Sequence, residues 1–297
     1  MPQSDLDQIH NFLEYLQFQK RYSLHTISAY QTDLEDFYTF LQKEYGESPV
    51  NPTPSQIRSW LASLRQADMK PKSINRKMSS LKSFFKYLLR NSKIASSPMA
   101  NITSLKVNKR LPSFIEEKDI NTLFTQVEFP DTWQGKTDKL LLSIFYQCGV
   151  RVSELLNLKD SSIDSGNGSL KVLGKGNKER LIPINNDLIH QIEIYQNEKK
   201  NRSIKTSFLL INEKGNPFTR SSVYVIVNKY LSMVSTNEKR SPHILRHSFA
   251  THLTNHGADI NAIKELLGHS SLASTQVYTS NSIEKLKDIH KLAHPKA

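Results

Sequence analysis

The chain has 297 residues, of which 37% are hydrophobic and 23% are charged, and its formal net charge is +12. A chain of this length favours two domains, each able to bury its own core. This composition is ordinary for a soluble globular protein, and no apolar run reaches the roughly 18 residues that span a bilayer. The acidic N-terminal stretch MPQSDLDQIHNFLEYL lacks the pattern of a signal peptide, so we expect a cytoplasmic protein with no membrane partner.

The positive charge is concentrated in one segment. Residues 1–50 hold three lysines and arginines against eight acids, whereas residues 51–110 hold thirteen against one. A local excess of this size attracts polyanions, so nucleic acid is a candidate partner. A basic segment taken alone is equally compatible with a solvated surface.

The first 92 residues are expected to form a helical domain. Apolar residues recur at helical spacing over residues 4–20 and 23–45. The sequence Thr53-Pro54-Ser55-Gln56 then supplies an N-cap, a proline at the first helical position and a capping-box glutamine. It predicts a third helix to about residue 64, and a fourth follows from Pro71 to Arg90.

The fourth helix carries an apolar stripe and, on its other faces, six basic residues without an acidic neighbour in the same helix. Surface charges on a helix normally alternate in sign, because pairs of like charge four residues apart are unfavourable. We therefore expect this basic face to bind DNA, with a solvated surface as the alternative. The six residues are Lys72, Arg76, Lys77, Lys82, Lys86 and Arg90.

Residues 93–111 have no periodicity and are rich in Ser, Asn and Lys, which indicates a linker to a second domain over residues 112–297. In that domain a capping-box pair, Ser113 and Glu116, predicts a helix to about residue 127. A buried helix should end at Gly149. Two β-rich runs surround residues 175–178 and predict a hairpin, and residues 208–212 are a candidate third strand. The remainder reads as helical, with helices ending near Gly257 and Gly268.

Four segments of the second domain hold side chains suited to phosphodiester chemistry. Their sequences are CGVRVSELLNL with Arg151, VLGKGNKERLIP with Lys175, SPHILRHSFATHL with His243 and Arg246, and LLGHSSLASTQVYTS with His269 and Tyr278. Two guanidinium groups can hold the oxygens of a phosphorane transition state in fixed geometry. A tyrosine near such cations can act as nucleophile, a lysine can protonate the leaving oxygen, and histidines can donate hydrogen bonds or shuttle a proton.

Each of these residues also has an ordinary structural interpretation. Arg151 can form an ion pair with Glu154 three residues later, His269 can cap a helix, and Tyr278 can be a half-buried core residue. His243 and His247 have the spacing of zinc ligands, but no HExxH motif or third ligand accompanies them. The only cysteine is Cys148, which excludes an intrachain disulfide and a cysteine-based zinc site. The loop at residues 174–178 does not match the GxxxxGK[ST] motif of a nucleotide-binding loop.

In their order and spacing the four segments resemble the site-specific tyrosine recombinase family, also called the phage integrase family, and most closely its Xer branch. The resemblance implies a mainly α fold, with an N-terminal four-helix, SAM-like core-binding domain and a mostly helical catalytic domain that contains a small antiparallel β-sheet. It also implies which residues form the active site. These are Arg151, Lys175, His243, Arg246, His269 and the nucleophile Tyr278.

The resemblance further implies the reaction and its partners. Tyr278 would attack the scissile phosphate of double-stranded DNA, form a 3′-phosphotyrosyl bond and release a 5′-hydroxyl, with neither a metal nor ATP as cofactor. A tetramer of the chain, alone or with a paralogous recombinase, would hold two recombination sites, and activation by a DNA translocase is left open. The expected role is resolution of chromosome dimers at cell division.

Other interpretations are also compatible with the sequence. The chain can be the integrase or invertase of a mobile element, a type IB topoisomerase, or a DNA-binding architectural protein without activity. The C-terminal segment SIEKLKDIHKLAHP has an apolar stripe that can dock on a neighbouring protomer or pack on its own core.

Overall fold

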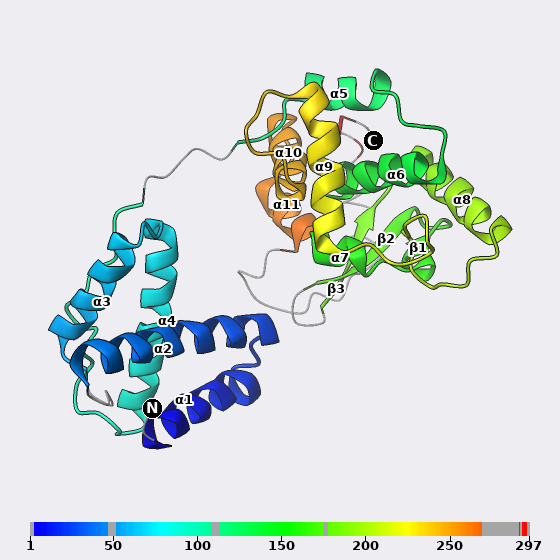
Figure 1. The fold of residues 1–297 in the computed structure, drawn as a ribbon. Helices are drawn as coiled ribbons and strands as arrows, with labels where there is room; N and C mark the ends of the chain where they lie inside the picture. The colour runs from blue at the N-terminus through cyan, green and yellow to red at the C-terminus, as the bar shows by residue number, and fades with distance from the viewer. Residues whose placement is uncertain are drawn as a thin grey trace. The chain divides into compact units, whose positions relative to one another are not determined.

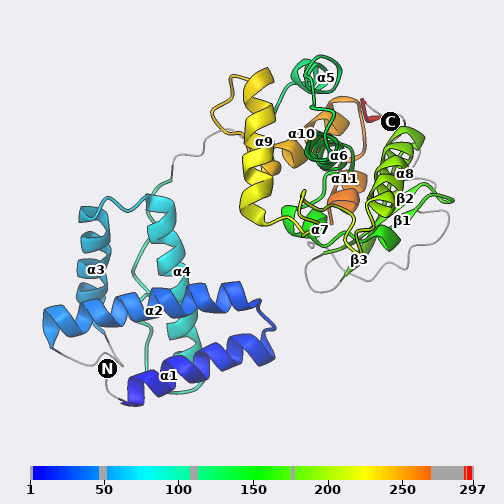
Figure 2. The same cartoon turned by 45° about the vertical axis from the view of Figure 1, so that its right-hand side comes forward.

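The computed structural model describes residues 3–46, 52–107, 113–174, 178–268, 291 and 293–295, without the side chains of residues 3–6. The chain divides into two compact units, Met1–Arg110 and Leu111–Ala297, each with its own apolar core. Figures 1 and 2 show both units. Within the described part of the chain, no helix has the length and apolar character needed to cross a bilayer.

The first unit is a four-helix domain, as predicted. The capping box at its third helix is present, because Gln56 N–H donates to the Thr53 hydroxyl and Thr53 N–H donates to the Gln56 side chain, at 3.3 and 2.7 Å. Aromatic side chains such as Phe37, Trp60 and Phe84 fill the core. The helices are α1 (Gln3–Glu14), continued by the π-helical turn η1 (Tyr15–Gln19), α2 (Leu24–Tyr45), α3 (Pro54–Gln66) and α4 (Pro71–Arg90).

Much of the stretch expected to be a linker packs on the first unit. Ile94, Met99 and Ile102 are buried in its core. The side chain of Asn75, on α4, donates to the carbonyl of Leu105 and accepts from its N–H, both at 2.9 Å. Residues 93–105 therefore belong to this unit, although they form no regular helix or strand whose period the sequence could reveal.

The expectation of an unpaired basic face on α4 is wrong for Arg76 and Lys77. Both bind Asp33, a fully buried residue of α2, and Lys77 also binds Asp36. The Ser80 hydroxyl donates to Asp33 at 2.7 Å. Lys77 is itself buried, whereas the other basic residues are exposed. The partners lie on another helix, where spacing within α4 could not reveal them.

Replacing Asp33 with alanine should lower the free energy of unfolding of the first unit by about 3 kcal/mol. Asp33 is fully buried and binds two buried side chains, those of Lys77 and Ser80, so its removal leaves Lys77 with only the half-exposed Asp36. Urea denaturation measures this loss. Asp36→Ala is the matched control: its side chain is 50% exposed, so removing it should cost below about 1 kcal/mol. Equal losses in the two variants would contradict a stabilising role for the buried carboxylate.

In the second unit, helices surround α6, which is buried along most of its length. It contacts α8 and α10, and Figure 2 shows it near the middle of this unit. The helices are α5 (Glu117–Thr125), α6 (Trp133–Cys148), α7 (Val152–Leu156), the 3-10 turn η2 (Asp160–Ser162), α8 (Asn186–Asn201), α9 (Arg220–Val234), α10 (Pro242–Asn255) and α11 (Ile260–Leu267).

Two local expectations for this unit are wrong. The first helix begins after Glu116 without a side-chain cap, so Ser113 is not its N-cap. Residues 208–212 form only isolated bridges, one of which joins Phe208 to Lys159. The predicted hairpin is present, and the third antiparallel strand precedes it. The strands, in sheet order, are β1 (Ile163–Asp164), β2 (Ser169–Leu173) and β3 (Glu179–Pro183).

Gly149 ends α6 as predicted and turns the chain toward α7. Its φ of +56° is in the left-handed region, and a Cβ at this position would lie 2.5 Å from Phe249 Cδ1. Both observations require glycine. The tight turn leaves Val150 buried and places Arg151 immediately before α7.

The end of the chain packs on the second unit where the structure describes it. Ala293 and His294 are buried, and the Nδ1 of His256 lies 2.8 Å from the carbonyl oxygen of Ala293. For these residues the packing is on the chain's own core. The stripe at residues 283–289 lies outside the described residues, so docking on a neighbouring protomer stays a prediction.

Candidate active site

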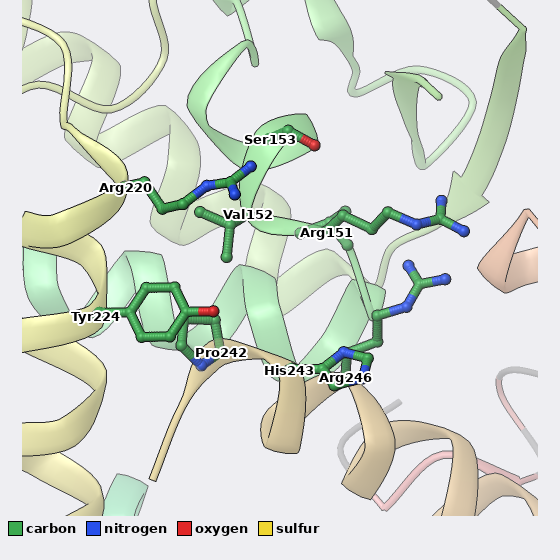
Figure 3. Close-up of a pocket in the computed structure, with 9 residues that line it drawn as sticks. Arg151, Val152, Ser153, Arg220, Tyr224, Pro242, His243 and Arg246 are labelled. Atoms are coloured by element: carbon green, nitrogen blue, oxygen red, sulfur yellow. The ribbon is translucent and has the colours of Figure 1, made fainter. Parts of the chain in front are cut away.

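Three of the six predicted active-site residues line one pocket. Arg151 reaches it from the start of α7, and His243 and Arg246 reach it from the first turns of α10 (Figure 3). The side chains of Arg220 and Tyr224, on α9, border the same pocket, together with Val150, Val152, Ser153 and Pro242. Lys175, His269 and Tyr278 lie outside the described residues.

Arg246 is held between the ends of two helices. Its guanidinium donates at 2.6 Å to the carbonyl of Gly149, after α6, and at 2.6 Å to that of Leu267, at the end of α11. The negative ends of the two helix dipoles favour a cation there. Burial and, next, the charge of Arg151 lower the pKa of Arg246 to about 9, which leaves it cationic at neutral pH. A guanidinium has five N–H donors, so others are left for a ligand.

Arg151 forms the ion pair with Glu154 that its spacing allowed. The Glu154 carboxylate accepts hydrogen bonds from the backbone N–H and from Nη1 of Arg151, both at 2.7 Å. The Glu154 side chain is only 1% exposed. Nη2 of Arg151 donates to the carbonyl of Gly268 at 3.1 Å. The Arg151 side chain remains 36% exposed and still borders the pocket. The pair thus orients Arg151 without removing it from the pocket.

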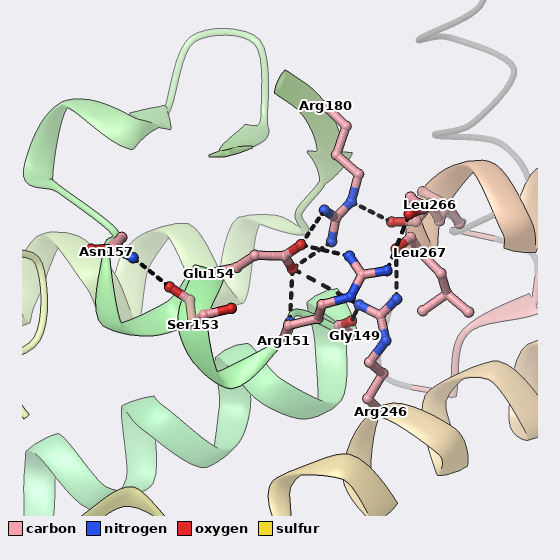
Figure 4. Close-up of polar contacts among 10 residues, drawn as sticks. Gly149, Arg151, Ser153, Glu154, Asn157, Arg180, Arg246, Leu266 and Leu267 are labelled. Atoms are coloured by element: carbon pink, nitrogen blue, oxygen red, sulfur yellow. Dashed lines mark hydrogen bonds and ion pairs between the residues drawn. The ribbon is translucent and has the colours of Figure 1, made fainter. Parts of the chain in front are cut away.

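A third arginine, Arg180, was not identified from the sequence. Both of its terminal nitrogens donate to Glu154 at 2.8 Å, and its Nε donates to the carbonyl of Leu266 at 2.8 Å (Figure 4). A signal was present in the strand alternation. Arg180 is two residues from Ile182 on β3, which puts a charge on the buried face of the strand. A buried charge normally has a specific partner.

The cluster is therefore rich in positive charge. Three guanidinium groups surround one carboxylate, and the closest approach of Arg246 to Glu154 is 3.9 Å. The carbonyls at the end of α11 offset part of the excess. Such a cluster, open to solvent through Arg151 and His243, is suited to bind an anion with several oxygens, such as a phosphodiester.

Glu154 is ionised far into the acid range. Burial raises its pKa, but the hydrogen bonds and charge of Arg180, with further hydrogen bonds from Arg151, outweigh it and lower the pKa to about 2. A carboxyl whose folded pKa lies below its unfolded value stabilises the fold above the unfolded pKa of 4.5 and loses that contribution as the pH falls toward 2.

Removing this group should flatten the acid side of the stability profile. Between pH 5 and pH 2.5 the free energy of unfolding of the unchanged protein should fall by roughly 2 to 3 kcal/mol more than that of Glu154→Gln. Denaturation at a series of pH values measures both. Glu179→Gln is the control, because Glu179 forms a surface pair with Lys171 and is 56% exposed. An acid profile of Glu154→Gln identical to that of the unchanged protein would contradict the assignment.

Two of the three histidines of α10, His243 and His247, lie four residues apart and differ in exposure. His243 is exposed at the pocket, whereas His247 is partly buried. Burial and, next, His243 lower the pKa of His247. Among the residues that the structure describes, no third histidine, cysteine or carboxylate joins them in a group that could hold a metal ion.

Comparison with known proteins identifies the family. The model of the phage integrase family matches residues 113–285, and that of the N-terminal SAM-like domain of phage integrases matches residues 9–92. The tyrosine recombinase XerC of Bacillus licheniformis is 37% identical over 291 residues, covering 96% of this chain and 95% of the relative. That of Oceanobacillus iheyensis is 36% identical over 294 residues, covering 97% and 96%.

Solved structures share the fold. The XerH recombinase in a post-cleavage complex with a palindromic difH substrate has a TM-score of 0.72 at 21% identity, over 97% of this chain and 81% of that one. A lambda integrase tetramer bound to a Holliday junction has a TM-score of 0.66 at 16% identity, over 92% and 80%. The family models cover both units, and the XerC relatives match over nearly their whole length. The chain therefore belongs to the phage integrase family of tyrosine recombinases, in its Xer branch.

Proposed function

We propose that this protein cuts and rejoins double-stranded DNA at specific sites and resolves chromosome dimers at cell division. The observation that carries the proposal is the pocket at which Arg151, from α7, meets His243 and Arg246, from α10. These segments are far apart in the sequence, and their side chains meet as a phosphoryl-transfer site requires. Full-length similarity to XerC recombinases supports the assignment.

The proposed reaction proceeds by two transesterifications. The phenol oxygen of Tyr278 attacks the scissile phosphorus and forms a 3′-phosphotyrosyl bond, while the bond from phosphorus to the 5′ oxygen breaks. Lys175 gives a proton to that oxygen, and His269 takes part in moving the phenol proton. The 5′-hydroxyl of a partner duplex then attacks the phosphotyrosyl bond. One ester replaces another at each step, so the reaction needs neither ATP nor a metal.

The described residues would stabilise the transition state. Arg151 and Arg246 each use two side-chain nitrogens to bind Glu154 or backbone carbonyls, and their other N–H groups can bind the nonbridging oxygens of the phosphate. His243, exposed at the pocket, would donate a further hydrogen bond. The helical first unit would hold the duplex through exposed residues of α4, namely Lys72, Arg76, Lys82, Lys86 and Arg90. We leave Lys77 out of this proposed set because it is buried.

We further propose that four protomers hold two recombination sites. The lambda integrase relative forms a tetramer on a Holliday junction, and strand exchange between two duplexes requires one nucleophile for each strand. The four protomers would be copies of this chain, alone or alternating with a paralogous recombinase, and a DNA translocase would activate them. The reaction would take place in the cytoplasm, where a bacterial chromosome lies.

Sequencing of protein-linked DNA from cells tests this function. We expect covalent adducts at one chromosomal locus, and recombination in vitro between two plasmid copies of that site. Adducts at the ends of many mobile elements would instead identify an integrase or invertase. Relaxation of supercoiled plasmids without a site requirement would identify a type IB topoisomerase. DNA binding with no adduct at any site would identify an architectural protein.

A further inference from the structure

Arg180 has no part in the proposed reaction, yet all three of its guanidinium nitrogens donate hydrogen bonds at the site. It lies on β3 and, unlike Arg246, is not among the residues that line the pocket, so we assign it no contact with the phosphate. We propose that Arg180 is a positioning residue: it fixes Glu154 and the end of α11, and thereby holds Arg151 and Arg246 in the geometry that binds the scissile phosphate. This inference rests on the proposed function for the role of the pocket.

The first support is the end of α11, where three consecutive backbone carbonyls each accept a hydrogen bond from a different arginine. Unpaired carbonyls at a helix C-terminus carry partial negative charge, so three cations stabilise this turn. Because the three arginines share one short segment, displacement of that segment would disturb all of them. The pairs are Leu266 with Arg180 at 2.8 Å, Leu267 with Arg246 at 2.6 Å, and Gly268 with Arg151 at 3.1 Å.

The second support is the shared carboxylate. Arg180 binds both oxygens of Glu154, at 2.8 Å each, in the parallel geometry that a planar guanidinium favours. The same two oxygens accept from the backbone and side chain of Arg151. Without Arg180 the buried carboxylate would keep hydrogen bonds from Arg151 alone, with Arg246 at 3.9 Å, and would draw Arg151 inward. The Arg151 side chain, which should face the phosphate, would then take a different orientation.

The third support is close packing around the guanidinium. A Cβ on Gly268 would lie 3.1 Å from Arg180 Cδ and 3.2 Å from its Nη1. Gly268 has a φ of +63° and ends α11, so the arginine lies directly against the turn that it binds. A lysine at position 180 would retain the charge but not the two-pronged contact with Glu154 or the Nε contact with Leu266.

The test separates positioning from folding and from DNA binding. Cleavage of a nicked substrate is measured in a single turnover at saturating protein, and DNA affinity is measured separately, both well below the melting temperature of each variant. Arg180→Gln should cleave about 100-fold more slowly, the cost of a misplacement on the order of 1 Å, with unchanged DNA affinity. Arg180→Lys should recover only part of the rate, because lysine restores the charge but not the two parallel hydrogen bonds to Glu154.

The matched control is Lys199→Gln. Lys199 is a buried cation of the same unit that binds Asp160 at 2.7 Å and the carbonyls of Phe208 and Leu209, with no contact to the pocket residues. The Lys199→Gln variant should have a lower melting temperature and an unchanged cleavage rate. The double variant of Glu154→Gln with Arg180→Gln should cleave no more slowly than the slower single variant, since both changes disturb one contact network.

Three results would overturn the inference. These are a wild-type rate for Arg180→Gln, full recovery by Arg180→Lys, and an equal rate loss in Lys199→Gln, which would reduce the effect to general destabilisation. In each case the unchanged protein still forms its adduct, so the proposed function stands. Absence of an adduct in the unchanged protein would instead refute the proposed function, and this inference with it.

Discussion

Tyr278→Phe should form no covalent adduct with DNA while binding it as tightly as the unchanged protein does. Phenylalanine retains the ring but lacks the oxygen that would bond to phosphorus, so the first transesterification has no nucleophile. A nicked substrate loses the short fragment that carries the 5′-hydroxyl and traps any adduct. The covalent protein–DNA adduct is then quantified on a denaturing gel, and DNA affinity is measured by gel shift.

A second tyrosine makes this experiment discriminating. Tyr224 borders the pocket from α9 and is 42% exposed, so it is the alternative nucleophile among the described residues. Tyr224→Phe should still form the adduct. Loss of the adduct in Tyr224→Phe, with retention in Tyr278→Phe, would assign the nucleophile to α9 and contradict the proposed reaction.

Arg246→Gln should cleave on the order of 1000-fold more slowly than the unchanged protein, again with DNA binding retained. The phosphorane formed during cleavage carries more negative charge than the ground state, and a preorganised cation in a buried site stabilises that increment strongly. Arg246 is 5% exposed and held by Gly149 and Leu267, so its position requires no reorganisation during the reaction. The single-turnover rate at saturating protein measures the effect.

Two variants separate chemistry from packing in this case. Arg246→Lys retains a charge without the planar fork, so its rate should fall between those of Arg246→Gln and the unchanged protein. Arg202→Gln removes an exposed arginine of the same unit, paired with Glu198 at 3.3 Å, and should not change the rate. A loss of cleavage rate in Arg246→Gln that came entirely from weaker DNA binding would contradict the assigned role.

The sequence predicted most helix boundaries because local chemistry determines them. Thr53 and Gln56 form the capping box that their spacing indicated, and Gly149 and Gly268 adopt the left-handed conformation at helix ends. Residues 208–212 show the opposite case. They have strand-like composition, but they pair only through isolated bridges and join no sheet strand, so tertiary context decided the outcome.

Charge pairing between elements was the least predictable feature. The sequence alone does not show that the acidic residues 1–50 and the basic residues 51–110 pair with each other. In the structure, Asp33 and Asp36 of the first segment neutralise Lys77 of the second. At the site, the spacing of Arg151 and Glu154 gave a correct ion pair, while Arg180, 26 residues beyond Glu154, completes the same network. Motif order predicted that Arg151, His243 and Arg246 meet, but the residues that hold them in place required coordinates.

The central claim, that Arg246 neutralises charge developing on the scissile phosphate, is tested most directly with DNA that carries a neutral methylphosphonate at that position. Cleavage of this DNA is compared with cleavage of ordinary DNA, for Arg246→Gln and for the unchanged protein. The account predicts that the defect of about 1000-fold on phosphate shrinks to less than about tenfold on methylphosphonate, because the transition state then carries one negative charge fewer for Arg246 to stabilise. An equal defect on both substrates would show that Arg246 acts only through the fold, and would contradict the account.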